Sequence, residues 1–217
     1  MENHHDLLKM LEEEGEGKHI TPKQAQILQA AVEIFAEKGY ASSSTSEIAA
    51  KAGVAEGTIF RHYKTKKDLL ISIATPVMTK FTVPFFASQF AKQVFDEPPA
   101  GFEQLLRNLI KNRFEFAKEN IPLLKIILQE FAFHQELQEN FQHVFKEEVF
   151  PKFERMLEYF KQKEQIIDYP SPVIIRLMMS TIVGFIITRF LILPEEDWDD
   201  EKELEQTIQY ILNGLSM

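Results

Sequence analysis

Apolar residues return every three or four positions along most of the chain, which is the period of an α-helix. No long stretch shows the period of two that a half-buried strand would have. The pattern therefore predicts an all-α protein without an internal repeat. Helices are expected near residues 22–38, 45–52 and 55–63, from 66 onward with disturbances at Pro76 and Pro84, and near 101–119, 122–133, 136–163 with a bend or break at Pro151, 172–193 and 200–214.

The clearest helix boundaries lie between residues 44 and 63. Ser44 and Glu47 have the spacing of a capping box, in which the serine covers the amide three residues on and the glutamate reaches back. Gly53 supplies the left-handed geometry that ends this first short helix, and a second helix can begin near Ala55. Two short helices joined by a tight turn are the layout of a helix-turn-helix, whose second helix enters the major groove of DNA.

The order of residues here also resembles the DNA-binding domain of the tetracycline-repressor-like (TetR) family of bacterial transcription regulators. The resemblance rests on G-Y at 39–40, I-A-x-x-A-G-V at 48–54, G-T-I-F-R-H-Y at 57–63 and K-x-K-K-D-L at 64–69. It implies a role in DNA binding for Thr45, Gly57, Thr58, Phe60, Arg61, His62 and Lys66, with Lys66 on a phosphate. Ala55 and Phe60 depart from the usual serine and tyrosine, and each substitution removes a hydroxyl that could bind a phosphate oxygen.

Glu56 allows two interpretations. Its carboxylate repels phosphate, so in the groove it would have to accept a hydrogen bond from a cytosine amino group. Alternatively, it complements the positive end of the second helix.

Charge is distributed unevenly along the chain. The formal net charge is -9 for the whole chain, but residues 18–80 hold nine Lys and Arg against five acids, whereas residues 1–17 and 81–217 are acidic. The basic part coincides with the helix-turn-helix, so an acidic remainder leaves one defined face for a nucleic acid.

Residue composition and pattern argue against cysteine chemistry, secretion and insertion into a membrane. The absence of cysteine excludes disulfides, thiol chemistry and cysteine-ligated zinc. The chain does not open with a basic and then apolar signal segment, so we expect a cytoplasmic protein. Residues 173–193 are long enough to span a bilayer, but Arg176 and Arg189 lie within them. Arginine is costly at membrane depth, which favours a buried helix and no membrane partner.

The last two helices are expected to form a homodimer. The penultimate helix is apolar nearly all round and carries a row of small or polar residues, and the last helix carries one apolar stripe. A single subunit would have too few layers to cover both, so pairing with a second copy would build a four-helix interface. The predicted dimer residues are Arg176, Ser180, Gly184, Thr188, Leu204, Ile208, Ile211 and Leu215.

The phenylalanine-rich middle of the chain is the expected sensor of a small lipophilic effector. In the helix near 101–119, Arg113 shares a side with Phe102, Leu109 and Phe116. If Arg113 faces a pocket, it suits a lipophilic molecule with an anionic end. If it lies at the edge of the apolar stripe, it reaches water or a neighbouring acid instead. The acidity of this half offers a third possibility, a lipophilic cation.

The pattern divides the chain into an acidic tail (1–17), a three-helix DNA-binding domain (18–66) and a larger helical ligand-binding and dimerisation domain (67–217). Together with the resemblance, it predicts a non-enzymatic repressor that releases a palindromic double-stranded DNA operator on binding its effector and needs no cofactor. The alternatives are a helical metal-carboxylate enzyme, suggested by Glu130 with His134 and Glu139 with His143, and a helical interaction module. The residues of these two pairs stand four apart, whereas di-iron bundles use the spacing Glu-x-x-His.

Overall fold

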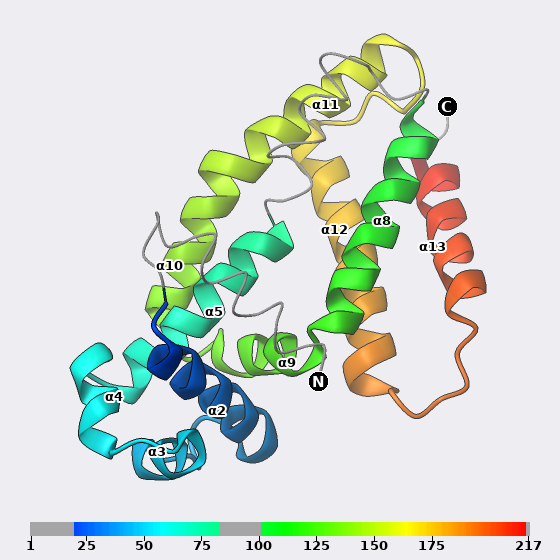
Figure 1. Cartoon of the computed structure of the whole chain (residues 1–217). Coiled ribbons are helices and arrows are strands. Elements are labelled where there is room, and N and C mark those ends of the chain that lie inside the picture. Colours follow the sequence, from blue (N-terminus) through cyan, green and yellow to red (C-terminus); the bar gives the residue numbers. More distant parts are fainter. Residues whose placement is uncertain (1–19, 83–100, 216–217) are drawn as a thin grey trace. The chain divides into compact units, whose positions relative to one another are not determined.

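The computed structural model describes residues 20–82 and 101–215, and Figure 1 shows the order of their helices. Every regular element in these two ranges is a helix, so the predicted all-α class is confirmed. The acidic tail and Pro84 lie outside the described residues.

The helices belong to two compact units. The first unit takes residues up to Phe81 and Glu119–His143, and the second takes Thr82–Lys118 and the residues from Val144 onward. The predicted division into 1–17, 18–66 and 67–217 stays a prediction. The helices of the first unit are α2 (Pro22–Lys38), α3 (Thr45–Ala52), α4 (Glu56–His62), α5 (Lys66–Thr82), α9 (Ile121–Glu130) and α10 (Gln135–Val144). The last residue of α5 and the last residue of α10 belong to the second unit.

Local capping sets the boundaries of the first helices. The Thr21 hydroxyl accepts from the Gln24 amide at 3.3 Å, and α2 ends at Gly39, whose φ is 80°. The Ser44 hydroxyl accepts from the Glu47 amide at 3.2 Å, and the Glu47 carboxylate accepts from the Ser44 amide at 3.0 Å. Gly53 adopts the left-handed conformation at φ 67°, which glycine reaches without steric cost. The predicted start and end of α3 are therefore confirmed.

The core of the first unit is built from the predicted inner faces. In α2 these residues are Ile27, Ala31, Ile34 and Phe35, all buried. They are joined by Ile48 of α3 and Ile59 of α4, each with 0% exposure. α2 packs on α3 and α9, and α3 packs on α4. The helix-turn-helix is thus fixed on a packed support.

Two prolines behave differently from each other. Pro76 lies inside α5, which continues through it to Thr82. Pro151 lies in the first turn of α11, and the π-helical segment η1 (Phe145–Val149) comes directly before it. The Phe150 amide donates to the Phe145 carbonyl five residues back. The predicted irregularity of the 136–163 stretch is therefore a change of helical type, located just before the proline.

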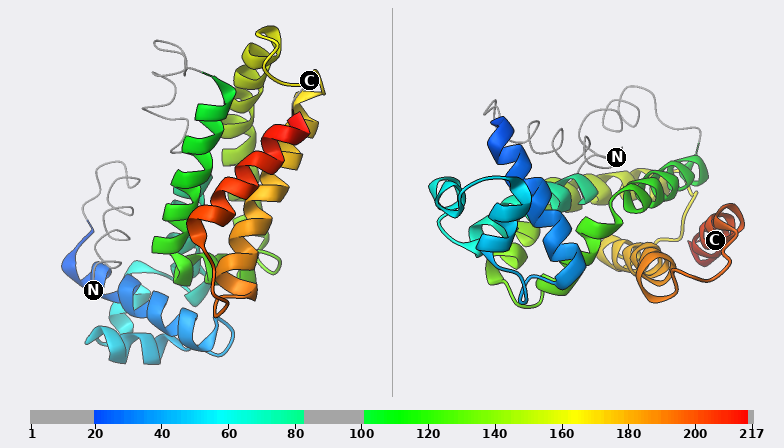
Figure 2. Two further views of the ribbon diagram at one scale, coloured as in Figure 1. Left: turned by 90° about the vertical axis from the view of Figure 1, so that its right-hand side faces the viewer. Right: turned by 60° about the horizontal axis from the view of Figure 1, so that its bottom comes forward.

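The second unit is a bundle of long helices, as Figures 1 and 2 show. The helices are α8 (Phe102–Glu119), α11 (Phe150–Gln162), α12 (Ser171–Ile187) with its π-helical continuation η2 (Thr188–Ile192), and α13 (Asp200–Leu215). Phe102 packs on Phe160 of α11 with ring centroids 5.5 Å apart. Phe114 packs on Phe185 of α12 and Phe190 of η2. Aromatic contacts from α8 thus join the bundle on two sides.

Residues Ser171–Ile192 are long and apolar enough to cross a membrane by length and composition alone. α12 packs on both α11 and α13, and Arg176 lies on its exposed side. Among the residues that the structure describes, one side of this helix is buried and the other is exposed.

Candidate nucleic-acid interface

The exposed residues of α4 lie on one side of the helix. Glu56, Gly57, Phe60 and Arg61 are exposed, whereas Ile59 is buried. Residues four positions apart share a side of a helix, so Glu56 lies beside Phe60 and Gly57 lies beside Arg61. Of the other residues expected to bind DNA, Thr58 and His62 are half-buried. We call the four exposed residues the α4 face.

Gly57 is not required by packing within the described chain. A Cβ placed on Gly57 meets no described atom within 4 Å, and the backbone φ at this position is not in the left-handed region. Glycine in a helix is less favourable than alanine by up to about 1 kcal/mol. The position therefore suits close approach of an external partner to the backbone of α4.

A hydrogen bond joins the start of α3 to the start of α4. The Thr45 hydroxyl donates to Glu56 Oε1 at 2.6 Å. Thr45 is half-buried and Glu56 is exposed. In this arrangement the single hydroxyl proton of Thr45 is directed at a carboxylate of the same protein.

Lys66 contacts the turn between α2 and α3. Its ammonium donates to the carbonyl oxygens of Tyr40 and Ser43, each at 2.7 Å, and lies 4.3 Å from the centre of the Tyr40 ring. An ammonium has three N–H groups, so one remains beside these two bonds, and the predicted contact of Lys66 with a phosphate stays a prediction. The sequence pattern missed these contacts because both partners are backbone oxygens, 23 and 26 residues earlier.

The same turn also meets the loop between α9 and α10. The Tyr40 ring packs edge-on against His134 at 5.1 Å, and His134 Nε2 lies 3.2 Å from Glu130 Oε2. Burial, followed by the nearby Glu130 carboxylate, raises the pKa of Tyr40. Lys67 of α5 pairs with Glu136 of α10 at 2.9 Å. In the part of the chain that the structure describes, no three His, Asp or Glu side chains are grouped to hold a metal ion.

The predicted ligand residues of α8 lie in the second unit. Phe102 and Leu109 are buried, and Phe116 is half-buried. Arg113 is only 7% exposed, so it does not reach water at the edge of the apolar stripe. It contacts Asn112 Oδ1 through Nε at 3.1 Å and through Nη2, and its guanidinium lies 5.5 Å from the Phe116 ring. Burial lowers the pKa of Arg113 to about 10.

Of the predicted dimer residues in this region, three lie on the outer side of α12, and Thr188 begins η2. Arg176, Ser180 and Gly184 are exposed and Thr188 is half-buried. Leu177 is 43% exposed on the same side, and a Cβ placed on Gly184 meets no described atom within 4 Å. We call Arg176, Leu177, Ser180 and Gly184 the α12 face.

The predicted dimer residues of α13 are buried, unlike those of α12. Leu204, Ile208, Ile211 and Leu215 are all buried within one chain, at exposures of 7% or less. These four side chains are therefore covered within one chain, and their contact with a second copy stays a prediction. They are covered because α13 turns this apolar stripe toward its own bundle, next to α12. Tyr210, at 71% exposure, is on the outer side instead.

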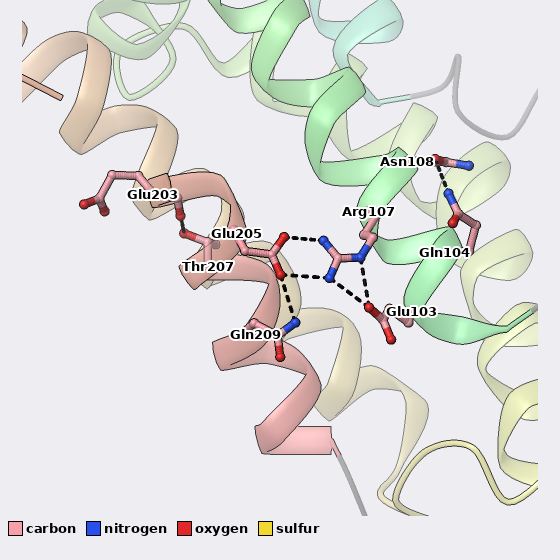
Figure 3. Close-up of polar contacts among 8 residues, drawn as sticks. All are labelled: Glu103, Gln104, Arg107, Asn108, Glu203, Glu205, Thr207 and Gln209. Atoms are coloured by element: carbon pink, nitrogen blue, oxygen red, sulfur yellow. Dashed lines mark hydrogen bonds and ion pairs between the residues drawn. The ribbon is translucent and has the colours of Figure 1, made fainter. Parts of the chain in front are cut away.

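Ionic contacts hold α13 to α8, as Figure 3 shows. Arg107 of α8 binds both carboxylate oxygens of Glu205, and it also binds Glu103 one turn earlier on its own helix. Gln209 donates to Glu205 at 2.9 Å. These donors, with Arg107 as the largest cause, lower the pKa of Glu205 to about 2. At the other end of α8, Lys118 pairs with Asp200, which also accepts from Arg189.

Comparison with known proteins gives the same assignment for the helix-turn-helix region. Residues 27–73 match the family described as "Bacterial regulatory proteins, tetR family". The chain is 50% identical over 64 residues to the fatty acid metabolism regulator protein of Bacillus subtilis (strain 168), covering 30% of this chain and 33% of that protein. This match therefore spans about a third of the relative's length.

Other similarities cover most of the chain. An uncharacterised HTH-type transcriptional regulator of Mycobacterium tuberculosis (strain ATCC 25618 / H37Rv) is 27% identical over 180 residues, 82% of this chain and 87% of that protein. The structure of the transcriptional regulator FadR from Bacillus subtilis in complex with stearoyl-CoA has a TM-score of 0.66 and 25% identity, covering 87% of this chain and 97% of that one. A TetR-family structure from Shewanella sp. PV-4 has a TM-score of 0.64 at 20% identity, covering 91% and 100%. The helix-turn-helix region of the chain therefore belongs to the TetR family of bacterial regulatory proteins, and the chain as a whole has the fold of TetR-family structures.

Proposed function

We propose that the protein is a homodimeric repressor that holds a palindromic DNA operator through α4 and releases it when a fatty acyl effector binds the second unit. The observation that carries the proposal is Gly57, which is exposed on α4 and surrounded by open space among the described residues. A helix that lies in the major groove brings its backbone close to the duplex, and glycine permits that approach. Arg61, exposed on the same side, can bind guanine with two hydrogen bonds.

The α12 face supports the homodimer. Small residues let two helix backbones approach closely, and Ser180 and Gly184 lie one turn apart with Leu177 beside them. Tyr210 and Gly214 of α13 are exposed as well, and a Cβ placed on Gly214 meets no described atom within 4 Å. A two-fold dimer would place two copies of α4 on half-sites about 34–36 Å apart, one turn of DNA. Such a protein acts on the chromosome, hence in the bacterial cytoplasm.

Arg113 supports an effector with an anionic end. Arg113 is buried on α8, and a guanidinium binds a carboxylate or phosphate through charge-assisted hydrogen bonds. The apolar side chains Phe102, Leu109 and Phe116 on the same helix suit an acyl chain. One relative is named for fatty acid metabolism, and one similar structure contains stearoyl-CoA. These names make acyl-CoA the first effector class to test.

Fluorescence anisotropy with labelled genomic fragments tests the function. We expect tight binding to a few fragments, an affinity that falls steeply with salt, and release on addition of stearoyl-CoA. Free coenzyme A serves as the control for the head group and should not release the DNA. Binding that does not distinguish fragments would overturn the regulator, whereas selective binding that no acyl-CoA or fatty acid reverses would overturn only the effector.

A further inference from the structure

Glu56 is an acidic residue on a face that is otherwise suited to DNA. It is exposed at the start of α4, next to Gly57 and four residues before Phe60. A carboxylate on this face repels the phosphate backbone, so tight binding requires that it meet a different part of the duplex. The position of Glu56 therefore points to the edges of the bases.

The chemistry of the base edges narrows the choice. In the major groove guanine presents two acceptors, and thymine presents an acceptor and a methyl group, so neither can donate to a carboxylate. Adenine presents a donor beside the N7 acceptor, which repels the second carboxylate oxygen. Cytosine presents its N4 amino group as a donor. Of the four bases, cytosine fits a carboxylate best.

The hydrogen bond from Thr45 fixes the orientation of that carboxylate. Its hydroxyl holds Glu56 Oε1 at 2.6 Å, which leaves Oε2 able to accept from a base. A side chain held in place before binding loses less conformational freedom when the complex forms. Thr45 lies on α3 and is itself half-buried, so the support for Glu56 comes from a different helix.

We propose that Glu56 reads a cytosine in each half of the operator and that Thr45 is the positioning residue that holds its carboxylate. The inference rests on the proposed function, because it needs α4 in the major groove. It gives the operator a defined feature, a C·G pair at the symmetric position that faces Glu56. In this arrangement Thr45 acts through Glu56 instead of donating to a phosphate.

Selection from a random double-stranded DNA pool tests the inference with the full-length chain. The wild type should enrich a two-fold symmetric motif with a C·G pair at one symmetric position. Glu56→Gln should keep the rest of the motif and change that pair to A·T, because an amide binds adenine N6 and N7 together. The preference between the two pairs should reverse by roughly 5- to 150-fold.

Three further variants separate specific reading from general effects. Glu56→Ala should lose the preference at that position without gaining another, and it provides the test if Glu56→Gln does not fold. Thr45→Val should weaken the cytosine preference, and Thr45→Ser, which restores a hydroxyl, should recover it. Glu47→Gln removes the same charge from α3, where Glu47 pairs with Lys38 at 2.7 Å, and should leave the motif unchanged.

The outcomes distinguish the two levels of the proposal. If the wild type enriches no motif, the proposed function fails. If it enriches a motif that is identical for Glu56→Gln and Glu56→Ala, the function stands and the reading of cytosine is overturned. If Glu56→Gln and Glu56→Ala instead bind every sequence more tightly by the same factor, the carboxylate only repels DNA. That result also overturns the reading of cytosine.

Discussion

The α4 face and the α12 face share one feature and differ in their chemistry. Each carries a helical glycine, Gly57 or Gly184, around which the described residues leave open space. On α4 the glycine stands beside Glu56 and Arg61, whereas on α12 it stands among Leu177 and Ser180, with Arg176 two turns away. A glycine that internal packing does not need indicates a close external contact, and its neighbours indicate the partner. A cationic neighbour such as Arg61 favours a nucleic acid, and small or apolar neighbours favour a second copy of the chain.

Gly184→Trp tests the α12 face and should have the largest effect. An indole ring would keep two α12 helices apart, so the proposed dimer should dissociate. Operator affinity should then fall by a factor on the order of 100 or more, because two linked half-site contacts become independent. Analytical sedimentation measures the mass of the assembly, and fluorescence anisotropy measures its affinity for the operator. Glu154→Trp, on the exposed side of α11 in the same unit, is the matched control and should change neither. A dimer that persists in Gly184→Trp would place the contact elsewhere.

Gly57→Ala tests the α4 face. The added methyl group should raise the free energy of unfolding by up to about 1 kcal/mol, because alanine favours a helix. It should at the same time lower operator affinity about tenfold, or ~1.4 kcal/mol, by blocking close approach to the duplex. Asn108→Ala, on the exposed side of α8 in the second unit, also adds a residue that favours a helix and should leave DNA affinity unchanged. If Gly57→Ala and the wild type bind DNA equally well, Gly57 is not needed for close approach of α4 to the duplex.

Lys66→Met distinguishes the contacts of Lys66 with the chain's own carbonyl oxygens from its predicted contact with a DNA phosphate. Loss of a charged donor from two backbone carbonyls should lower the free energy of unfolding by ~1–3 kcal/mol. If Lys66 also binds a phosphate, the slope of log affinity against log salt should fall by about 0.9. Lys64→Met, at an exposed position two residues away, should leave stability unchanged. Unchanged melting of Lys66→Met would show that its two carbonyl contacts contribute nothing to stability.

Glu205→Gln should have the smallest effect and should touch neither face. The folded-state pKa of Glu205 is lowered from 4.5 to about 2, so its ion pair stabilises the fold above pH 4.5 and the stabilisation is lost as pH falls toward 2. The variant should be slightly less stable than the wild type at neutral pH, and the two should converge toward pH 2. Urea unfolding across this range measures the difference. A gap that stays constant with pH would contradict the assigned role of the carboxylate.

The sequence was sufficient to predict structural features that depend on residues a few positions apart. The capping pair Ser44 and Glu47 and the terminal glycines Gly39 and Gly53 set helix ends through contacts a few residues apart. Hydrophobic spacing likewise predicted that Ile59 faces inward. Within α3 and α4, spacing alone was therefore enough.

Features that depend on distant partners were not predictable from spacing. The stripe through Ile208 was expected to meet a second copy, but periodicity identifies which side of a helix is apolar and not which helix covers it. The pairing of Arg107 with Glu205 joins residues 98 positions apart. The bond from Thr45 to Glu56 depends on how the turn at Gly53 folds α4 back onto α3. The DNA, effector and dimer residues themselves stay predictions.

The Lys66 contacts have a consequence for how this region tolerates mutation. Its ammonium holds the main-chain oxygens of Tyr40 and Ser43, which remain in place whichever side chains those positions carry. Natural variants can therefore exchange residues in the turn without losing these two bonds, whereas position 66 requires a long cationic side chain. Random mutagenesis scored by growth or reporter output should find the exposed turn residues Ala41 and Ser42 permissive and the single lysine intolerant.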